Sequence, residues 1–406
     1  MFIRSAGFAG TILLAAGLAQ AAVIHVSLQG DDSAAGDSWA TAKRTIQAAV
    51  DVAGYADTVL ISNGIHVLTN TIRIEHDVGE LRSLDGRNVI IDGNHQVPCL
   101  AANKRVNLHG LTFRNGKGTG PTETGGGISM TDGGLIADCQ VISNRADGGG
   151  GICGYNLVIS NCVVAHNLAI YGQGGGLNLG TFKDCGLAVL NTVISNNTAE
   201  DSLNGHAEGG GIRISEDGGQ AWIINCRIVN NRAVGPRNYN AGGGLYVNYA
   251  TALTVRNTLI AGNEARDNGG GAWVALGTAF ENCTIAGNVS DGKGSGLLLR
   301  TQSYSPYGCR VENSIVFSNY SLYSGSWRDD VYLVENTSNW FDHVVVGNRS
   351  NDPPLPGTAI VYGADPRFLN GALEAWRLSR YSPCINAGTN RPWMIGARDL
   401  DRVARL

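Results

Sequence analysis

Short runs of alternating apolar and polar residues recur through the middle of the chain. Seven segments share one template, which reads Asn or Asp, then Cys, Thr or Ser, any residue, Ile or Val, two more residues and Asn. They are DCQVISN (138–144), NCVVAHN (161–167), NTVISNN (191–197), NCRIVNN (225–231), NTLIAGN (257–263), NCTIAGN (282–288) and NSIVFSN (313–319). RNVIIDGN (87–94) and LHGLTFRN (108–115) are less regular copies. A recurrence at 23 to 34 residues indicates a repeat architecture.

A glycine motif interleaves with this template. It occurs as GGGISM (125–130), GGGICG (149–154), GGGLNL (174–179), GGGIRI (209–214), GGGLYV (242–247), GGGAWV (269–274) and the degenerate GSGLLL (294–299). Each unit therefore carries a Gly triplet, two short strands, Asn, a third strand and Asn again. The apolar positions follow a period of two and not 3.6, which excludes a helical solenoid.

A unit of three short strands cannot bury its own apolar side chains. When units stack at about 4.8 Å, each inward residue gains a like neighbour above and below. The pattern therefore predicts an all-β fold, a single-stranded parallel β-helix with three-strand coils. Its hand should be right, because crossover connections between parallel strands almost always are.

The repeated polar positions have structural explanations. We expect both Asn positions at bends, where Asn tolerates left-handed backbone and its amide bonds along the stack, giving two Asn ladders. The Gly triplets should form a third corner, where loops of variable length re-enter the stack. One further position should be small and buried. It holds Cys139, Cys162, Thr192, Cys226, Thr258, Cys283 and Ser314. A disulfide between Cys139 and Cys162 is geometrically possible but not required.

The first 21 residues have the form of a signal peptide. An uncharged run from Ala6 to Leu18 precedes the small-x-small sequence Ala19-Gln20-Ala21. The run is shorter than the ~20 residues that a membrane-spanning helix needs, and no later stretch is long and uncharged enough. We therefore expect an exported protein, secreted or held at the cell surface, without a membrane-spanning segment.

The mature chain divides into three regions by pattern. Residues 22–86 are assigned to an amino-terminal cap with the first strands, 87–319 to the repeats, and 320–406 to carboxyl-terminal coils and a cap. The amino-terminal region contains one amphipathic helix, which should cover the open sheet edge of the first coil. Its apolar face holds Ile46, Ala49, Val50 and Ala53.

Charge and cysteine content narrow the function classes. The chain has 30 basic and 34 acidic residues, and loss of Arg4 with the signal peptide takes the net charge from −4 to −5. Nucleic acid is not an expected partner, because no basic surface is indicated. Nine Cys cannot all pair within one chain, and none are spaced as metal ligands.

These motifs resemble those of a known superfamily. The chain is similar to secreted bacterial proteins of the pectate-lyase-like right-handed parallel β-helix superfamily. Its interleaved motifs resemble the GGAI and FxxN repeats of polymorphic outer-membrane proteins. SWATAKRTIQAAVD (38–51) and DPRFLN (365–370) with SPCINAG (382–388) resemble parts of "choice-of-anchor" β-helix proteins of environmental bacteria. The resemblance implies the fold but not a function, since the superfamily hosts lyases, hydrolases, epimerases and adhesins.

The candidate functional residues lie on loops between the second Asn and the next Gly triplet. These loops should lie side by side at one edge, and the segments 198–208, 232–241 and 264–268 carry most of their chemistry. The catalytic candidates are Glu200, Asp201, His206, Glu208 and Arg237. The ligand-binding candidates are Tyr239, Glu264, Arg266 and Asp267. They could bind Ca²⁺ and a saccharide or act as acid and base, although a solvated loop edge is the plainer interpretation.

No recognisable catalytic constellation stands out. Asp31-Asp32 and His109 lack the setting of a glycoside hydrolase, and RAVGPR (232–237) lacks the RxPxxR spacing of a pectate lyase. We therefore expect a monomeric protein that binds a polysaccharide or cell-surface glycan, or that mediates adhesion, and that requires no cofactor. The alternatives are a polysaccharide lyase or glycoside hydrolase acting on acidic polysaccharides, with Ca²⁺ possible, and a purely structural protein.

Overall fold

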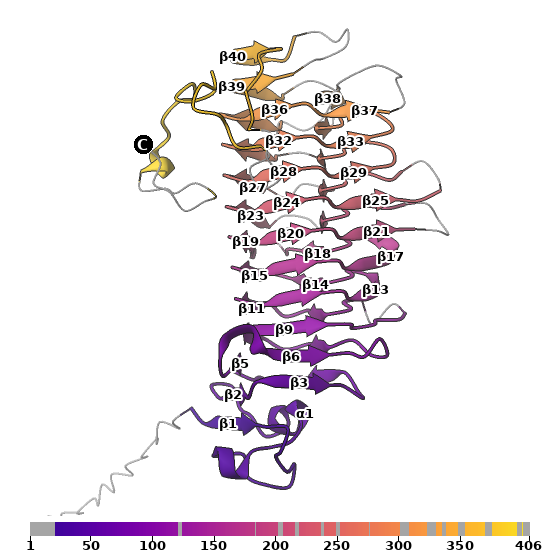
Figure 1. Cartoon of the computed structure of the whole chain (residues 1–406), viewed down its shortest axis with the longest axis vertical. Coiled ribbons are helices and arrows are strands. Elements are labelled where there is room, and N and C mark those ends of the chain that lie inside the picture. The colour runs from indigo at the N-terminus through magenta and orange to yellow at the C-terminus, as the bar shows by residue number, and fades with distance from the viewer. Residues whose placement is uncertain are drawn as a thin grey trace, which may run out of the picture.

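The structure is a computed structural model of the chain. It describes residues 21–120, 124–182, 184–201, 206–215, 219–236, 239–248, 252–275, 277–300, 308–322, 330–334, 338–347, 354–369, 376–395 and 400. Residues 1–20 of the expected signal peptide lie outside this set. The described strands form one elongated stack of coils, which starts with β1 at one end and reaches β40 at the other (Figure 1).

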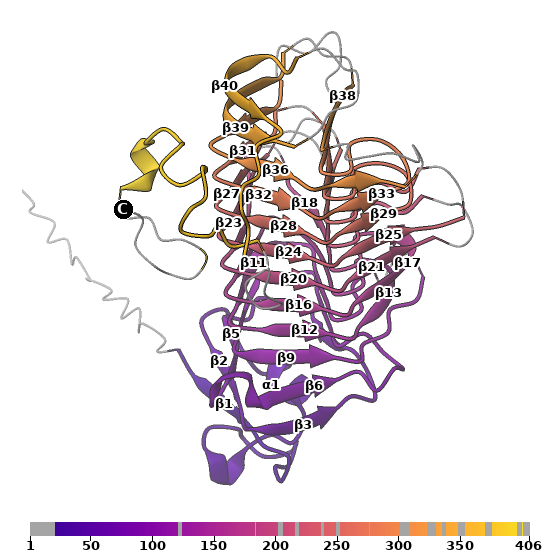
Figure 2. The same ribbon diagram turned by 45° about the horizontal axis from the view of Figure 1, so that its top comes forward.

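The strands pair in parallel into three sheets of 23, 10 and 7 strands, here called sheets A, B and C. Figure 2 shows that they run side by side along the stack. Sheet B comprises β4 (Ile72–Ile74), β7 (Leu100–Ala102), β10 (Ile128–Met130), β14 (Ile152–Tyr155), β18 (Leu177–Gly180), β22 (Ile212–Ser215), β26 (Leu245–Val247), β30 (Ala272–Val274), β34 (Leu297–Arg300) and β38 (Val331–Val334). Sheet C comprises β13 (Arg145–Gly148), β17 (Leu168–Gln173), β21 (Thr198–Glu200), β25 (Arg232–Val234), β29 (Glu264–Ala265), β33 (Val289–Ser290) and β37 (Tyr320–Ser321).

Sheet A contains two ladders, because each coil contributes two strands to it. The first holds β1 (Val23–Val26), β2 (Thr58–Ile61), β5 (Glu80–Ser83), β8 (Val106–His109), β11 (Gly134–Ala137), β15 (Leu157–Ser160), β19 (Gly186–Leu190), β23 (Gln220–Ile224), β27 (Ala252–Arg256), β31 (Ala279–Glu281), β35 (Arg310–Glu312), β39 (Trp340–Val346) and β40 (Gly357–Tyr362). The second holds β3 (Gly64–Val67), β6 (Val89–Asp92), β9 (Leu111–Arg114), β12 (Gln140–Ile142), β16 (Val163–Ala165), β20 (Val193–Ser195), β24 (Arg227–Val229), β28 (Leu259–Ala261), β32 (Thr284–Ala286) and β36 (Ile315–Phe317).

The chain order within one coil runs from sheet B through both ladders of sheet A to sheet C. For example, β18 is followed by β19, β20 and β21 before the next Gly triplet leads into β22. The predicted parallel β-helix with Asn ladders is confirmed. The structure adds a fourth short strand per middle coil, which belongs to sheet C and follows the second Asn.

The two Asn positions perform different tasks. The first sits at the bend within sheet A with φ between 48° and 57°. Its occupants are Asp138, Asn161, Asn191, Asn225, Asn257, Asn282 and Asn313. The second is at most 1% exposed, and the residue before it takes the positive φ. Its occupants are Asn144, Asn167, Asn197, Asn231, Asn263, Asn288 and Asn319.

The second, buried Asn position forms a continuous amide ladder. The backbone N–H and the Nδ2 of each Asn both donate to Oδ1 of the next Asn along the stack, at 2.8 to 3.0 Å. The ladder ends at Asp330, whose Oδ1 accepts from the N–H and Nδ2 of Asn319 at 2.8 and 2.7 Å. Each bend into sheet C thus has its polar groups satisfied inside the protein.

The Cys, Thr and Ser position lies inside the stack as predicted. Each of its occupants is at most 2% exposed, and all nine cysteines of the chain are free thiols. Burial raises the pKa of Cys226 to about 12. Their burial inside the stack makes these side chains packing residues.

The amino-terminal cap uses a shorter helix than the sequence pattern suggests. Helix α1 spans Ile46–Val50, after the 3-10 helix η1 (Trp39–Thr41). The predicted apolar face is buried, since Ile46, Ala49, Val50 and Ala53 are at most 4% exposed. Asp32 accepts hydrogen bonds from the backbone of Arg44 and Thr45 at 2.8 Å and so fixes the start of the helix. A further 3-10 helix, η2, spans Gly86–Asn88.

The last described segment, 376–395, folds back along the outer side of sheet A (Figure 1). It contains the 3-10 helix η3 (Pro392–Met394). Nη2 of Arg391 contacts carboxylate oxygens of Glu312 and Asp342, both at 2.9 Å. Asn313 exchanges two hydrogen bonds with the backbone of Thr389, at 2.8 and 2.9 Å. The segment therefore fastens the final coils from the side opposite sheet C.

Candidate functional site

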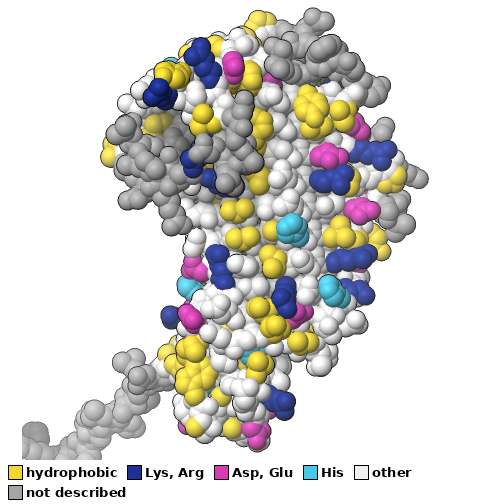
Figure 3. Space-filling model, in the orientation of Figure 1, with side chains coloured by type: hydrophobic (Ala, Val, Ile, Leu, Met, Phe, Trp, Pro, Cys, Tyr) yellow, Lys and Arg dark blue, Asp and Glu magenta, His cyan; other side chains and the backbone are white. Residues whose placement is uncertain are grey.

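The third-corner loops lie side by side, as the sequence predicts. In sheet C, Thr198 pairs with Arg232 and Arg232 pairs with Glu264. At the other end of the loops, Glu208 bridges to Ala241 and Ala241 bridges to Asn268. Lys, Arg, Asp and Glu side chains of both signs follow this edge of the molecule (Figure 3). The described ends of neighbouring loops therefore lie side by side from coil to coil.

An exposed aromatic pair projects from two neighbouring loops. The rings of His206 and Tyr239 stack with centroids 4.9 Å apart and planes 8° apart. Tyr239 is 69% exposed, and its φ of 134° is unusual for a residue other than Gly. Oδ2 of Asp267 holds this conformation by accepting from the backbone N–H of Tyr239 at 2.6 Å and of Asn240 at 2.7 Å. A backbone held in an unfavourable conformation to expose a ring indicates a functional position.

Two of the remaining acidic candidates, Asp201 and Glu264, are engaged by groups of the protein itself. Asp201 is 2% exposed and accepts from the N–H of His206 at 3.3 Å. Glu200 lies exposed at the end of β21. The Glu264 carboxylate accepts hydrogen bonds from both Nε and Nη2 of Arg232, at 2.9 and 3.2 Å. This bond is the main reason that the pKa of Arg232 is raised, and the charge of Glu200 adds to it.

The structure describes one of the two arginine candidates, Arg266, but not the other. Nη1 of Arg266 donates to the carbonyl oxygen of Gly235 at 2.7 Å, so it braces the loop that carries Tyr239. Burial raises the pKa of the nearby Asp291, and the charge of Arg266 opposes that shift. Arg237 lies outside the described residues.

Glu208 connects the loops to the outer face of sheet B. Its Oε2 accepts from Nε of Arg213 at 2.8 Å, and both side chains are largely buried. Nη1 of Arg213 donates to Asn178 at 3.1 Å and to Ser215 at 2.8 Å. Burial, and after it the charge of Glu208 and a hydrogen bond to it, raise the pKa of Tyr246, so the phenol stays protonated at neutral pH.

These contacts lead to a row of outward side chains that the candidate set missed. The strand register of sheet B places Asn178, Arg213, Tyr246, Trp273, Leu298 and Tyr332 in line on successive coils. We call them the sheet B row. The signal was present in the sequence, because the first four of these residues occupy the fifth position of the motifs GGGLN, GGGIR, GGGLY and GGGAW.

Two of the three aromatic rings of the sheet B row stack on one another. Tyr246 and Trp273 lie 4.7 Å apart with planes 16° apart. The guanidinium of Arg300 lies 5.9 Å from the Trp273 ring, and Nζ of Lys293 lies 4.4 Å from the Tyr332 ring. Tyr246 is only 6% exposed and Leu298 4%, so the accessible surface of the row comes from the half-buried rings of Trp273 and Tyr332 and from the cationic groups beside them.

The described part of the chain offers no ready-made metal centre. No three His, Cys, Asp or Glu side chains in it converge as ligands. Within the same residues, no helix is long and apolar enough to cross a membrane.

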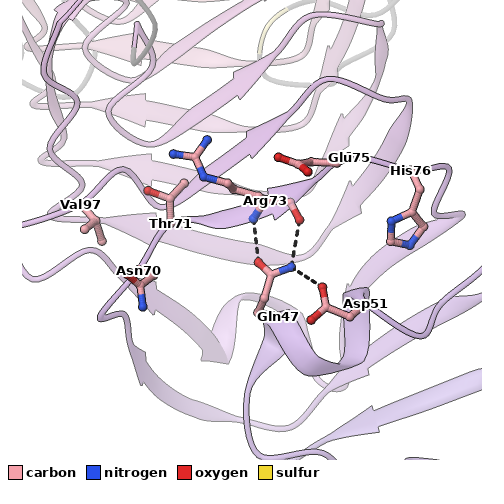
Figure 4. Close-up of a pocket in the computed structure, with 8 residues that line it drawn as sticks. All are labelled: Gln47, Asp51, Asn70, Thr71, Arg73, Glu75, His76 and Val97. Carbon is pink, nitrogen blue, oxygen red and sulfur yellow. Dashed lines mark hydrogen bonds between the residues drawn. The ribbon is translucent and has the colours of Figure 1, made fainter.

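A hollow of about 510 Å³ lies at the amino-terminal end between α1 and β4 (Figure 4). The Gln47 amide lies beside it and pairs with Arg73 as a further strand would, since Arg73 N–H donates to Oε1 at 2.8 Å and Nε2 donates to the Arg73 carbonyl at 3.1 Å. Nε2 also donates to Asp51 at 2.8 Å. β4 is the edge strand of sheet B at this end, so the Gln47 side chain protects an open sheet edge.

We expect Gln47→Ala to weaken this cap. Loss of the amide pair should lower the free energy of unfolding by about 1 to 2 kcal/mol and leave an edge open to self-association. Chemical unfolding and sedimentation at several concentrations measure the two effects. Gln29→Ala, at an exposed turn, is the control. Equal behaviour of the two variants would show that the amide does not protect the edge.

Comparisons with known proteins agree with this architecture. Residues 170–338 match the family model of a right handed β-helix region. The structure is similar to that of pectate lyase Pel9A, with TM-score 0.51, 15% identity, and coverage of 93% of this chain and 94% of that one. A rhamnogalacturonan lyase gives TM-score 0.47 and 14% identity, over 80% of this chain and 87% of that one. No curated protein sequence matches the chain significantly. At these identities the likeness concerns the fold.

Proposed function

Because the chain is a right-handed parallel β-helix protein with a pectate-lyase-like fold, we propose that it is a glycan-binding protein. A polysaccharide would lie across the sheet B row and against the aromatic pair of His206 and Tyr239. The proposal includes export, secretion or display at the cell surface, which the signal-like residues 1–21 support.

The exposed, strained Tyr239 is the observation that carries this proposal. Its ring is stacked on His206 and its backbone is fixed by Asp267, so the aromatic surface is ordered before a ligand arrives. Such preorganisation reduces the entropy lost on binding. Two residues after His206, Glu208 reaches Arg213 of the sheet B row, which makes the loop surface and the row contiguous.

The contacts of Glu208 favour binding over catalysis. A general acid or base needs a carboxylate free to exchange a proton with the substrate. The Glu208 carboxylate is instead paired with Arg213 and bonded to Tyr246. A polysaccharide lyase or glycoside hydrolase is the alternative, and Glu208, Arg213 and Tyr246 would form its centre.

A binding screen separates these functions. The exported protein is applied to glycan arrays and to polyuronides, with and without Ca²⁺, while absorbance is followed for unsaturated product. We expect retention on one or more glycans without turnover. Unsaturated or reducing product would establish an enzyme, and absence of any binding would contradict the proposal.

Tyr239→Ala tests the aromatic pair directly. Since the side chain is 69% exposed, the variant should keep its thermal stability. We expect its affinity for the bound glycan to fall about tenfold, the effect typical of a central aromatic contact. Tyr55→Ala, whose side chain is 80% exposed at the amino-terminal end, is the matched control. A wild-type affinity for Tyr239→Ala would remove the pair from the site.

A further inference from the structure

Most of the charged side chains around the proposed glycan site neutralise one another. Arg213 is paired with Glu208 at 2.8 Å and Arg232 with Glu264 at 2.9 Å. Arg266 donates to a backbone carbonyl and feels the charge of Asp291. Each of these guanidinium groups already has a fixed role in holding the loops, so none is the first choice for contacting a ligand.

Arg300 differs from these arginines. It ends β34, is exposed, and lies over the ring of Trp273. Its charge also acts on Tyr246, so both stacked rings of the row, Tyr246 and Trp273, lie within range of its charge. Among the described residues, no carboxylate forms an ion pair with it within 4.0 Å. Within the described part of the chain, the charge of Arg300 is therefore not neutralised by an ion pair.

A position over an aromatic ring suits a guanidinium to anion binding. The group is planar and its five N–H donors point outward in its own plane, so contact with a ring face leaves all of them available. A carboxylate or sulfate then accepts two parallel hydrogen bonds from the fork. The Trp273 ring would hold that fork in place.

We propose that Arg300, seated on Trp273, receives one anionic group of the glycan and sets the preference of the site for an acidic over a neutral chain. This inference rests on the proposed glycan-binding function. A carboxylate and a sulfate ester share the required chemistry. Arg300 is thus a specificity-determining residue, and the half-buried rings of Trp273 and Tyr332 contact the uncharged parts of the ligand.

Calorimetric titration of the full chain with matched glycan pairs tests this assignment. The pairs are polygalacturonate with its fully methyl-esterified form, and dextran sulfate with dextran. The variants are Arg300→Ala, Arg300→Lys and the control Arg105→Ala, which removes an exposed charge from a distant coil. Because Arg300 is exposed, its variants should keep the wild-type melting temperature.

We expect wild-type protein to bind the acidic member of at least one pair about tenfold more tightly than the neutral member. Arg300→Ala should abolish this preference, Arg300→Lys should restore part of it, and Arg105→Ala should leave it unchanged. Which acidic chain binds identifies the anion. Equal binding of acidic and neutral chains would overturn the role of Arg300 while leaving glycan binding intact. Equal losses in Arg300→Ala and Arg105→Ala would also overturn it, and no binding of any glycan would overturn both proposals.

Discussion

Gly210→Ala is expected to abolish correct folding of the middle coils. A Cβ at this position would lie 2.3 Å from the carbonyl oxygen of Arg232, 2.4 Å from its carbonyl carbon and 2.5 Å from its nitrogen. All three atoms belong to the backbone of β25, so no side-chain rotation relieves the overlap. Overpacking against movable side chains costs about 1 to 3 kcal/mol. We expect a larger loss here, roughly 4 kcal/mol or more, measured by thermal and chemical unfolding.

Gly277→Ala separates this steric effect from the ordinary cost of replacing glycine. Gly277 has φ of 75°, and a Cβ there would meet nothing within 4 Å. Its substitution should cost only the strain of left-handed backbone, about 1 to 2 kcal/mol. If both variants lost the same stability, close approach of backbones would not explain the second Gly of the triplet. If Gly210→Ala appeared only as insoluble protein while Gly277→Ala stayed soluble, the steric explanation would hold.

The fold could be predicted from the sequence, but the physical reason why the third corner requires three glycines could not. Periodicity two and the recurring motifs require stacked parallel strands whatever the loops do. The triplet was expected to admit variable loops. The structure shows that its second Gly touches the backbone of sheet C, as Gly210 does with Arg232, and that a Cβ on the third Gly would meet the buried Asn, as Gly211 does with Asn231. Contacts between residues 20 or more positions apart cannot be inferred from local pattern.

The geometry of the candidate site could be predicted in part, for the same reason. The loop edge followed from the register of the repeats, which brought His206 and Tyr239 together. The positive φ of Tyr239 and its bond to Asp267 depend on the loop backbone, which no residue pattern specified. The sheet B row was readable from the fifth position of the triplet motifs, but only once that position was known to face outward.

Asn231→Ala is expected to disrupt the buried amide ladder. Oδ1 of Asn231 accepts from the N–H and Nδ2 of Asn197, both at 3.0 Å. Its Nδ2 donates to the carbonyl of Ile194 and to Oδ1 of Asn263, also at 3.0 Å. Alanine would leave two donors and one carbonyl buried without their partner, each at about 1 to 3 kcal/mol. We expect the free energy of unfolding to fall by roughly 4 kcal/mol, read from urea denaturation.

The neighbouring Asn230 provides the matched control, because it shares the bend but not the ladder. Asn230 is exposed with φ of 56°, and the equivalent position on the next coil is Gly262, with φ of 65°. Asn230→Gly should therefore change stability by less than about 1 kcal/mol, since glycine accepts this backbone. A large loss in both variants would mean that the bend, and not the ladder, requires asparagine. A small loss in both would mean that water replaces the amide bonds, and that stability rests on the apolar interior alone.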